Sequence, residues 1–141
     1  MRLMQLVYAS RPFGFDELTL TEILLVARRL NKRDDITGSL ICREDLYLQM
    51  LEGPRAAVTA AYERISRDSR HTDVVVLWAG DAVERLFPGW EMRDDPAQSW
   101  MWTREEVRVG AVNEASAQDV RDVFVRLASE PYVQPRYDVS I

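Results

Sequence analysis

Gln49 is a polar side chain inside a segment that otherwise predicts a buried strand. Its neighbours from Leu46 to Leu51 are apolar or aromatic, and a short run of this kind is typical of a strand in a protein core. A buried amide that lacks hydrogen-bond partners costs about 1–3 kcal/mol. We therefore expect Gln49 to contact either another polar side chain inside the fold or a bound polar ligand.

Two more polar side chains occupy positions where apolar ones are expected. Asn31 follows Leu20 and Leu24 at helical spacing, so it continues the apolar face of a predicted helix. Tyr8 shares one face of a predicted strand with Met4 and Leu6, so its hydroxyl is expected to point off the sheet among apolar groups. Both positions predict a polar group inside the core.

Tyr8, Asn31 and Gln49 together would form an uncharged cluster of hydrogen-bond donors and acceptors. The cluster contains no histidine or thiol nucleophile, so it suits the binding of a planar, amide-bearing ring better than hydrolysis. Three plainer interpretations stay open: a tyrosine hydroxyl satisfied within the core, an asparagine that caps its helix, and a glutamine bonded to a neighbouring backbone. The convergence of the three side chains on one face favours a binding site.

The elements that must position these residues follow from hydrophobic spacing and turn residues. A capping box of Thr19 and Glu22 predicts the start of the first helix. We expect strands at residues 3–10, 36–42, 46–52, 74–78 and 90–93, and helices at 19–31 and 54–66. This order predicts an α+β, ferredoxin-like βαββαββ fold, with a five-stranded mixed sheet and both helices on one face. Tyr8 and Gln49 then lie on the central pair of strands, with Asn31 above them.

The fourth strand and the C-terminal tail have distinct signals. The continuous apolar run at 74–78 predicts a strand that is covered on both faces. We expect a domain at 1–95 and a C-terminal helical extension at 96–141, with helices that begin near Thr103 and Ser116 and cap the open face of the sheet. The alternative for the apolar residues at the start of the tail, Trp100, Met101 and Trp102, is an oligomer or partner surface.

The composition limits the classes of function. A chain of 141 residues with a net charge of −5 suits a core of ordinary size, and the absence of a basic stripe argues against nucleic acid as a partner. No apolar run is long enough to cross a membrane, and the N-terminus does not have the layout of a signal peptide. Cys42 and His71 are the only cysteine and histidine. We therefore expect a cytoplasmic protein with no internal disulfide, metal site or membrane span.

Six short motifs occur in a fixed order along the chain. They are Tyr8-Ala9-Ser10-Arg11, Asn31 followed by Ile36-Thr37-Gly38, Gln49-Met50-Leu51-Glu52-Gly53, Arg64-Ile65, Asp68-Ser69-Arg70-His71 and Phe87-Pro88-Gly89-Trp90-Glu91-Met92. Each motif is weak alone, whereas the ordered set is specific. Over about residues 1–95 the chain resembles the BLUF domain, a blue-light sensor that uses FAD.

The resemblance implies that the isoalloxazine ring of FAD, or of FMN as the alternative, lies between the two helices and over the sheet. It implies that Tyr8 donates an electron to the excited flavin, with a proton following. Gln49 would bridge the tyrosine and the flavin and then rearrange its hydrogen bonds, which shifts the flavin absorption to the red until it decays in darkness. The flavin-binding residues that it implies are Asn31, Ile23, Ala27, Ser10, Leu48, Ile65, Arg64, Asp68 and His71.

Some of these residues keep a second interpretation. Ser10 is either a partner in the flavin site or only an edge-strand residue. Arg28 and Arg29 either approach the FAD phosphates or form a solvated helix end. Trp90 and Met92 are expected to share one face of the last strand, where they either carry the signal outward or only pack in the core.

We expect no effector domain after the sensor, because the tail is too short for a cyclase or a phosphodiesterase. The chain would then be a non-enzymatic photoreceptor that acts through an unknown downstream partner or as a homo-oligomer. Two other classes stay open: a light-insensitive ferredoxin-like module that binds a small regulatory molecule, and a small dimeric oxygenase. Flavin colour and a response to blue light separate these classes.

Overall fold

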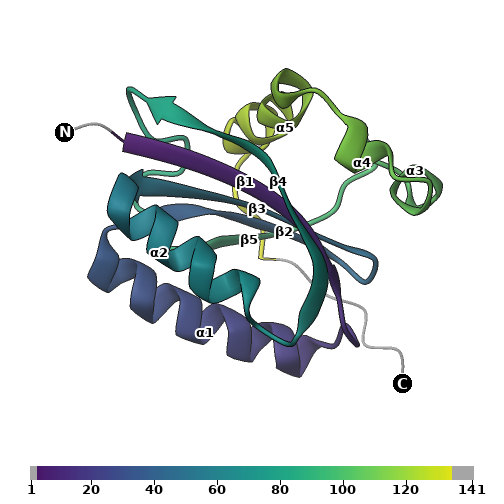
Figure 1. Cartoon of the computed structure of the whole chain (residues 1–141), viewed down its shortest axis with the longest axis horizontal. Helices are drawn as coiled ribbons and strands as arrows, with labels where there is room; N and C mark the ends of the chain where they lie inside the picture. Colours follow the sequence, from purple (N-terminus) through teal and green to yellow (C-terminus); the bar gives the residue numbers. More distant parts are fainter. Residues whose placement is uncertain (1–2, 135–141) are drawn as a thin grey trace.

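The computed structural model describes residues 3–134 as one sheet with helices on both of its faces (Figure 1). The strands are β1 (Leu3–Pro12), β2 (Thr37–Arg43), β3 (Leu46–Pro54), β4 (His71–Ala82) and β5 (Arg93–Pro96). The helices are α1 (Glu17–Asp34), α2 (Arg55–Ser66), α3 (Arg104–Arg108), α4 (Ala111–Glu114) and α5 (Ala117–Ala128). The predicted α+β class is confirmed.

The sheet has the order β4-β1-β3-β2-β5, and it is mixed because β5 runs parallel to β2 while the other neighbours are antiparallel. α1 and α2 lie together on one face, and α3, α4 and α5 lie on the other side of the sheet (Figure 1). β1 and β3 are adjacent, as predicted. Their register places Tyr8 directly opposite Gln49.

The sheet supports two hydrophobic cores, one on each face. Because side chains alternate along a strand, β1 sends Leu6 and Tyr8 toward α1 and α2, and Val7 and Ala9 toward α5. The second core contains Phe124 of α5 together with Val7 and Ala9 of β1. The C-terminal helices therefore cap the second face, as predicted, while the division of the chain at residue 95 stays a prediction.

α1 is longer than predicted at both ends. Its N-cap is Asp16, whose Oδ1 accepts a hydrogen bond from the backbone N–H of Thr19 at 2.7 Å. The prediction that Thr19 is the cap was wrong because Asp16, three residues earlier, takes that role. At the other end the helix continues past Asn31 to Asp34, and Asp35 closes it with a left-handed backbone at φ 58°.

β4 is an edge strand, and the prediction that both of its faces are covered was wrong. Val75 and Val76 are 36% and 42% exposed. The pairing of β4 with β1 shifts register twice, and Asp73 within it has a φ of 56°. Such irregularities twist an edge away from other strands. An apolar run does not by itself distinguish an edge strand from a central one.

Glu52 fixes the loop that leads from β4 to β5. Its carboxylate is fully buried and accepts hydrogen bonds from Gln5 Nε2 at 3.0 Å and Thr37 Oγ1 at 3.0 Å. It also accepts from the backbone N–H groups of Leu86 at 2.9 Å and Phe87 at 2.7 Å. The path of the chain toward β5 is thereby set from the middle of the sheet.

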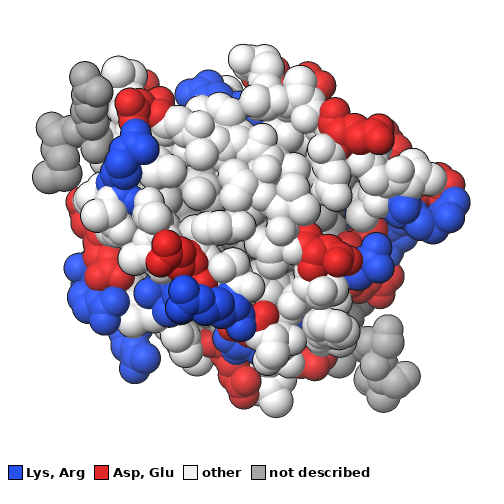
Figure 2. Space-filling view, in the orientation of Figure 1, with Lys and Arg blue, Asp and Glu red and all other residues white. Residues whose placement is uncertain are grey.

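The surface in the view of Figure 1 has an uncharged centre, and charged side chains of both signs lie around its rim (Figure 2). Within residues 3–134, no helix is both long enough and apolar enough to cross a membrane. The same residues contain no cluster of three or more histidine, cysteine or acidic side chains suited to a metal ion.

Candidate functional site

A cavity lies between α1, α2 and the sheet face that carries Tyr8. Its empty volume is about 480 Å³, which includes space open to solvent. Its lining residues are Tyr8, Ile23, Leu24, Ala27, Leu40, Tyr47, Gln49, Ile65, Asp68, Arg70, His71 and Met92. Mostly apolar walls with a few convergent polar groups are typical of a small-molecule site.

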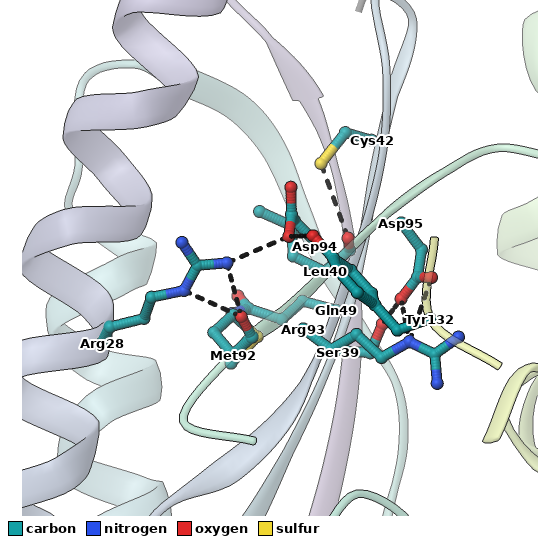
Figure 3. A network of polar contacts seen from close by, with 10 residues as sticks. All are labelled: Arg28, Ser39, Leu40, Cys42, Gln49, Met92, Arg93, Asp94, Asp95 and Tyr132. Carbon is teal, nitrogen blue, oxygen red and sulfur yellow. Dashed lines mark hydrogen bonds and ion pairs between the residues drawn. The ribbon is translucent and has the colours of Figure 1, made fainter. Parts of the chain in front are cut away.

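Tyr8 and Gln49 form a buried hydrogen-bonded pair on the sheet side of this cavity. The Tyr8 hydroxyl donates to Oε1 of Gln49, and Nε2 of Gln49 donates to Sδ of Met92 at 3.2 Å. Figure 3 shows this contact between the amide and the thioether. Tyr8 is 3% exposed and Gln49 is 4% exposed. The polar partner that the sequence requires for Gln49 is therefore Tyr8, together with a sulfur atom.

Burial controls the ionisation of the two tyrosines in the cavity. It raises the pKa of Tyr8 well above the ordinary tyrosine range, and the nearby Cys42 adds to the shift. It raises the pKa of Tyr47 to about 12. Both hydroxyls are therefore protonated at neutral pH, so Tyr8 is available as a hydrogen-bond donor to the amide.

Asn31 is buried at the C-terminal end of α1, where helical spacing predicts it. The side chain is 2% exposed, and its Nδ2 donates to the backbone carbonyl of Glu91 at 2.7 Å. It thus ties α1 to the residues just before β5. Asn31 is not among the residues that line the cavity, and its role as a flavin ligand stays a prediction.

His71 joins the end of β1 to the end of α2. Its Nδ1 lies 2.7 Å from Oγ of Ser10, and its Nε2 lies 2.7 Å from the carbonyl oxygen of Ile65. A carbonyl only accepts, so Nε2 carries a proton, and in the neutral ring Nδ1 accepts from the Ser10 hydroxyl. Ser10 therefore contacts the lining residue His71 and does not itself line the cavity, and its role in flavin binding stays a prediction.

Asp68 and Arg70 form an ion pair among the lining residues of the cavity. Nε of Arg70 donates to Oδ1 of Asp68 at 2.9 Å, and the backbone N–H of Arg70 donates to the same oxygen at 2.9 Å. These hydrogen bonds hold the pKa of Asp68 below its usual range. The charged groups of the cavity are thereby paired with each other.

Besides Asn31 and Ser10, two further predicted flavin residues, Leu48 and Arg64, do not line the cavity. Leu48 belongs to the core on the opposite face of the sheet, because successive residues of a strand point to opposite faces and Gln49 already points to the cavity. Arg64 is exposed on α2 and does not line the cavity, whereas its neighbour Ile65 does. Arg70 stands at the wall instead.

Trp90 and Met92 do not share a face, contrary to the prediction. β5 begins only at Arg93, so neither residue is in the strand and the alternation of a strand does not apply to them. Met92 turns into the cavity side and meets Gln49. Trp90 packs against the core under α5, and its ring lies 4.7 Å from that of Tyr132.

The sequence reasoning missed four lining residues, namely Leu24, Leu40, Tyr47 and Arg70. Two of them had a usable signal. Tyr47 lies two residues before Gln49 on the same strand, so strand alternation places both on one face. Leu24 was assigned to the apolar face of the first helix, although not to a binding site.

The residues of the cavity fit a flavin ring. The helices supply apolar walls from Ile23, Ala27 and Ile65, and the sheet supplies the neutral Tyr8–Gln49 pair. A flat, uncharged ring with amide groups at its edge matches apolar walls and neutral hydrogen-bonding side chains better than an ionic ligand would.

Comparisons with solved structures agree with this fold. BlrB, a BLUF protein in its dark state, superposes with a TM-score of 0.76 at 27% identity, covering 91% of this chain and 96% of that chain. The ground state of BlsA gives a TM-score of 0.78 at 24% identity and covers 95% of this chain and 92% of that one, a likeness of fold. Klebsiella pneumoniae BlrP1 with FMN and cyclic diGMP gives a TM-score of 0.66 at 27% identity, covering 90% of this chain and 33% of that chain.

Sequence comparison identifies the family. The photoactivated adenylate cyclase subunit beta of Euglena gracilis is 41% identical over 80 residues, which is 57% of this chain and 9% of that relative. This chain thus spans only a small part of the length of such relatives. The family model described as sensors of blue light using FAD matches residues 3–93. The chain therefore belongs to the BLUF family of flavin-based blue-light sensors.

Proposed function

We propose that this chain is a blue-light photoreceptor that binds FAD non-covalently in the cavity between α1, α2 and the sheet. The observation that carries the proposal is the buried series of hydrogen bonds from Tyr8 through Gln49 to Met92. FMN is the alternative flavin, because the similar structure of BlrP1 contains FMN and the two flavins share the same ring.

Tyr8 is the proposed electron donor. A bound flavin would supply the absorption of blue light and an electron acceptor next to this side chain. Burial keeps the Tyr8 hydroxyl protonated. Loss of an electron from Tyr8 is therefore easiest when the hydroxyl proton leaves together with the electron. The hydroxyl already donates to Oε1 of Gln49, so the route of the proton begins at that oxygen. The electron and the proton both return to Tyr8 afterwards, so the site has no net change in charge.

Gln49 is the proposed switch. Its amide presents Oε1 to Tyr8 and Nε2 to Met92, and a reversal of the amide exchanges these two groups. A thioether accepts a hydrogen bond but has no proton to donate, so the reversed amide loses its bond to Sδ of Met92. The reversal also changes the donors next to the ring, which accounts for a red shift without any buried net charge.

The proposed output runs through Met92 to β5 and the C-terminal helices, and from there to an unidentified protein partner or to a second copy of the chain. We infer no catalytic role for these residues. The Euglena relatives are photoactivated adenylate cyclases, and they are an example of an enzyme that light regulates. We do not propose a cyclase activity for this chain. A light-insensitive regulatory module and a small oxygenase are the competing functions.

Absorption spectra of the purified protein test the proposal. After loading with FAD, and separately with FMN, we expect a yellow protein whose flavin bands shift to the red in blue light and recover in darkness. A protein that takes up neither flavin would favour the regulatory module. A yellow protein with no light-induced shift would refute the sensor, and substrate-dependent oxygen consumption would favour the oxygenase.

A further inference from the structure

Arg28 holds the backbone of Met92. Its Nε and Nη2 donate to the Met92 carbonyl oxygen at 3.1 and 2.9 Å, and Nη2 also donates to Oδ1 of Asp94 at 3.0 Å (Figure 3). The sequence left this arginine either near the FAD phosphates or at a solvated helix end. The structure places its guanidinium on a backbone carbonyl at the entry to β5, 64 residues further along the chain.

Tyr132 binds the same carboxylate from the other side. Its hydroxyl donates to Oδ1 of Asp94 at 2.8 Å, the oxygen that also accepts from Arg28 (Figure 3). The Tyr132 ring lies 4.7 Å from that of Trp90, and the guanidinium of Arg93 lies 5.6 Å from the Tyr132 ring. Tyr132, which follows α5, is thus held at β5, the edge strand opposite to β4.

Met92 is therefore contacted at two points. Its sulfur accepts from Gln49, and its carbonyl accepts from Arg28. Asp94 is buried, with only 11% of its side chain exposed, so the two donors that meet it replace water and are worth more than surface contacts. The contacts from the Gln49 amide to the C-terminal segment are continuous.

We propose that Arg28 is a positioning residue for Met92, and that Asp94 and Tyr132 couple the docking of residues 131–134 to the hydrogen-bond state of Gln49. This inference rests on the proposed function. When the Gln49 amide reverses and releases the sulfur of Met92, the backbone held by Arg28 can shift, which weakens the contact of Tyr132. Coupling of this kind is reciprocal, so a loosened C-terminal segment disfavours the dark arrangement of Gln49.

The dark recovery of the flavin-loaded full chain tests the coupling. We expect Tyr132→Phe and Arg28→Gln each to keep the red shift and to slow recovery about threefold to tenfold, the range expected for the loss of one typical hydrogen bond. The double variant should recover little more slowly than either single variant, because both remove the same link. Arg126→Gln is the matched control, since it removes a cation–π contact with Trp100 at 4.1 Å elsewhere in the C-terminal layer.

Chymotrypsin cleavage after Tyr132 gives a second readout that does not depend on flavin kinetics. In the wild type, cleavage between Tyr132 and Val133 should be faster in blue light than in darkness. In Arg28→Gln it should already be fast in darkness.

The two proposals fail in different ways. A wild type with no red shift refutes the proposed function. If the wild type shows the red shift but Tyr132→Phe and Arg28→Gln recover in darkness at the wild-type rate, only the coupling is refuted. Equal cleavage in light and darkness, or slowing by Arg126→Gln to the same degree, also overturns the coupling.

Discussion

The hydroxyl of Tyr8 on β1 donates a hydrogen bond to Oε1 of Gln49, the residue directly opposite it on β3. The register of the two strands determines this contact. A slip of β3 by one residue would place Met50 or Leu48 opposite Tyr8, and Gln49 would then point to the other face of the sheet. The pair is buried, so bulk water does not compete for its hydrogen bond. The light response proposed for the chain depends on this single contact.

Removal of the Tyr8 hydroxyl should abolish the light response but keep the flavin. In Tyr8→Phe the ring still fills the cavity wall, whereas the proposed electron and proton donor is lost. We expect normal flavin content and no red shift under blue light, measured by absorption. Tyr62→Phe is the control. Tyr62 lies on α2 with its ring centroid 5.9 Å from that of Tyr8, and this variant should retain the red shift. A full photocycle in Tyr8→Phe would contradict the assigned role.

Replacement of the Gln49 amide should have the same spectral effect for a different reason. Leucine has a similar size but no donor or acceptor, so Gln49→Leu breaks the contacts to both Tyr8 and Met92. The Tyr8 hydroxyl would be left buried without its partner, at a cost of about 1–3 kcal/mol in the free energy of unfolding. Urea denaturation measures that cost. A persistent red shift in Gln49→Leu would remove the amide from the mechanism.

The sequence predicts the central pair of the site well and its surroundings less well. Tyr8 and Gln49 were placed together because strand alternation and a standard topology suffice for that contact. Leu48 was misplaced although the same alternation puts it on the face opposite to Gln49. Trp90 and Met92 were misjudged because they lie before β5, in a bend that has no period.

The remaining contacts depend on tertiary structure that a pattern does not contain. Arg28 binds a backbone carbonyl, a group that every residue carries, so nothing in the sequence marks Met92 as its partner. The edge position of β4 was also hidden, since its apolar run resembles that of a central strand. Long-range partners of this kind require the fold to be known.

Glu52 should matter for stability rather than for photochemistry. Its fully buried carboxylate accepts from two side chains and from the backbone of Leu86 and Phe87. Glu52→Gln turns one acceptor oxygen into an N–H group that faces backbone donors, so we expect a loss of about 2–3 kcal/mol in the free energy of unfolding. Thermal or urea unfolding measures it. An unchanged midpoint would show that the loop before β5 does not depend on this carboxylate.

Stability should fall at high pH because of the buried tyrosines. Burial raises the pKa of Tyr47 to about 12 and raises that of Tyr8 as well, whereas an unfolded tyrosine titrates near pH 10. Ionisation then favours the unfolded chain, so this stability is fully present below about pH 10 and is lost as the pH rises through about 12.

Denaturation midpoints at pH 8 and pH 11 measure this loss. Tyr47→Phe should reduce the difference between the two midpoints, because one of the groups responsible is gone. An equal pH dependence in the wild type and in Tyr47→Phe would show that Tyr47 is not a cause of the loss.

The reversal of the Gln49 amide is tested most directly by infrared difference spectra of the flavin-loaded protein with labelled glutamine side chains. We predict a glutamine carbonyl band that moves with the label, shifts under blue light, and returns with the same time course as the flavin absorption. The band should be absent from the difference spectra of Gln49→Leu and Tyr8→Phe. A wild type that shows the red shift but no label-sensitive glutamine band would refute the reversal of Gln49.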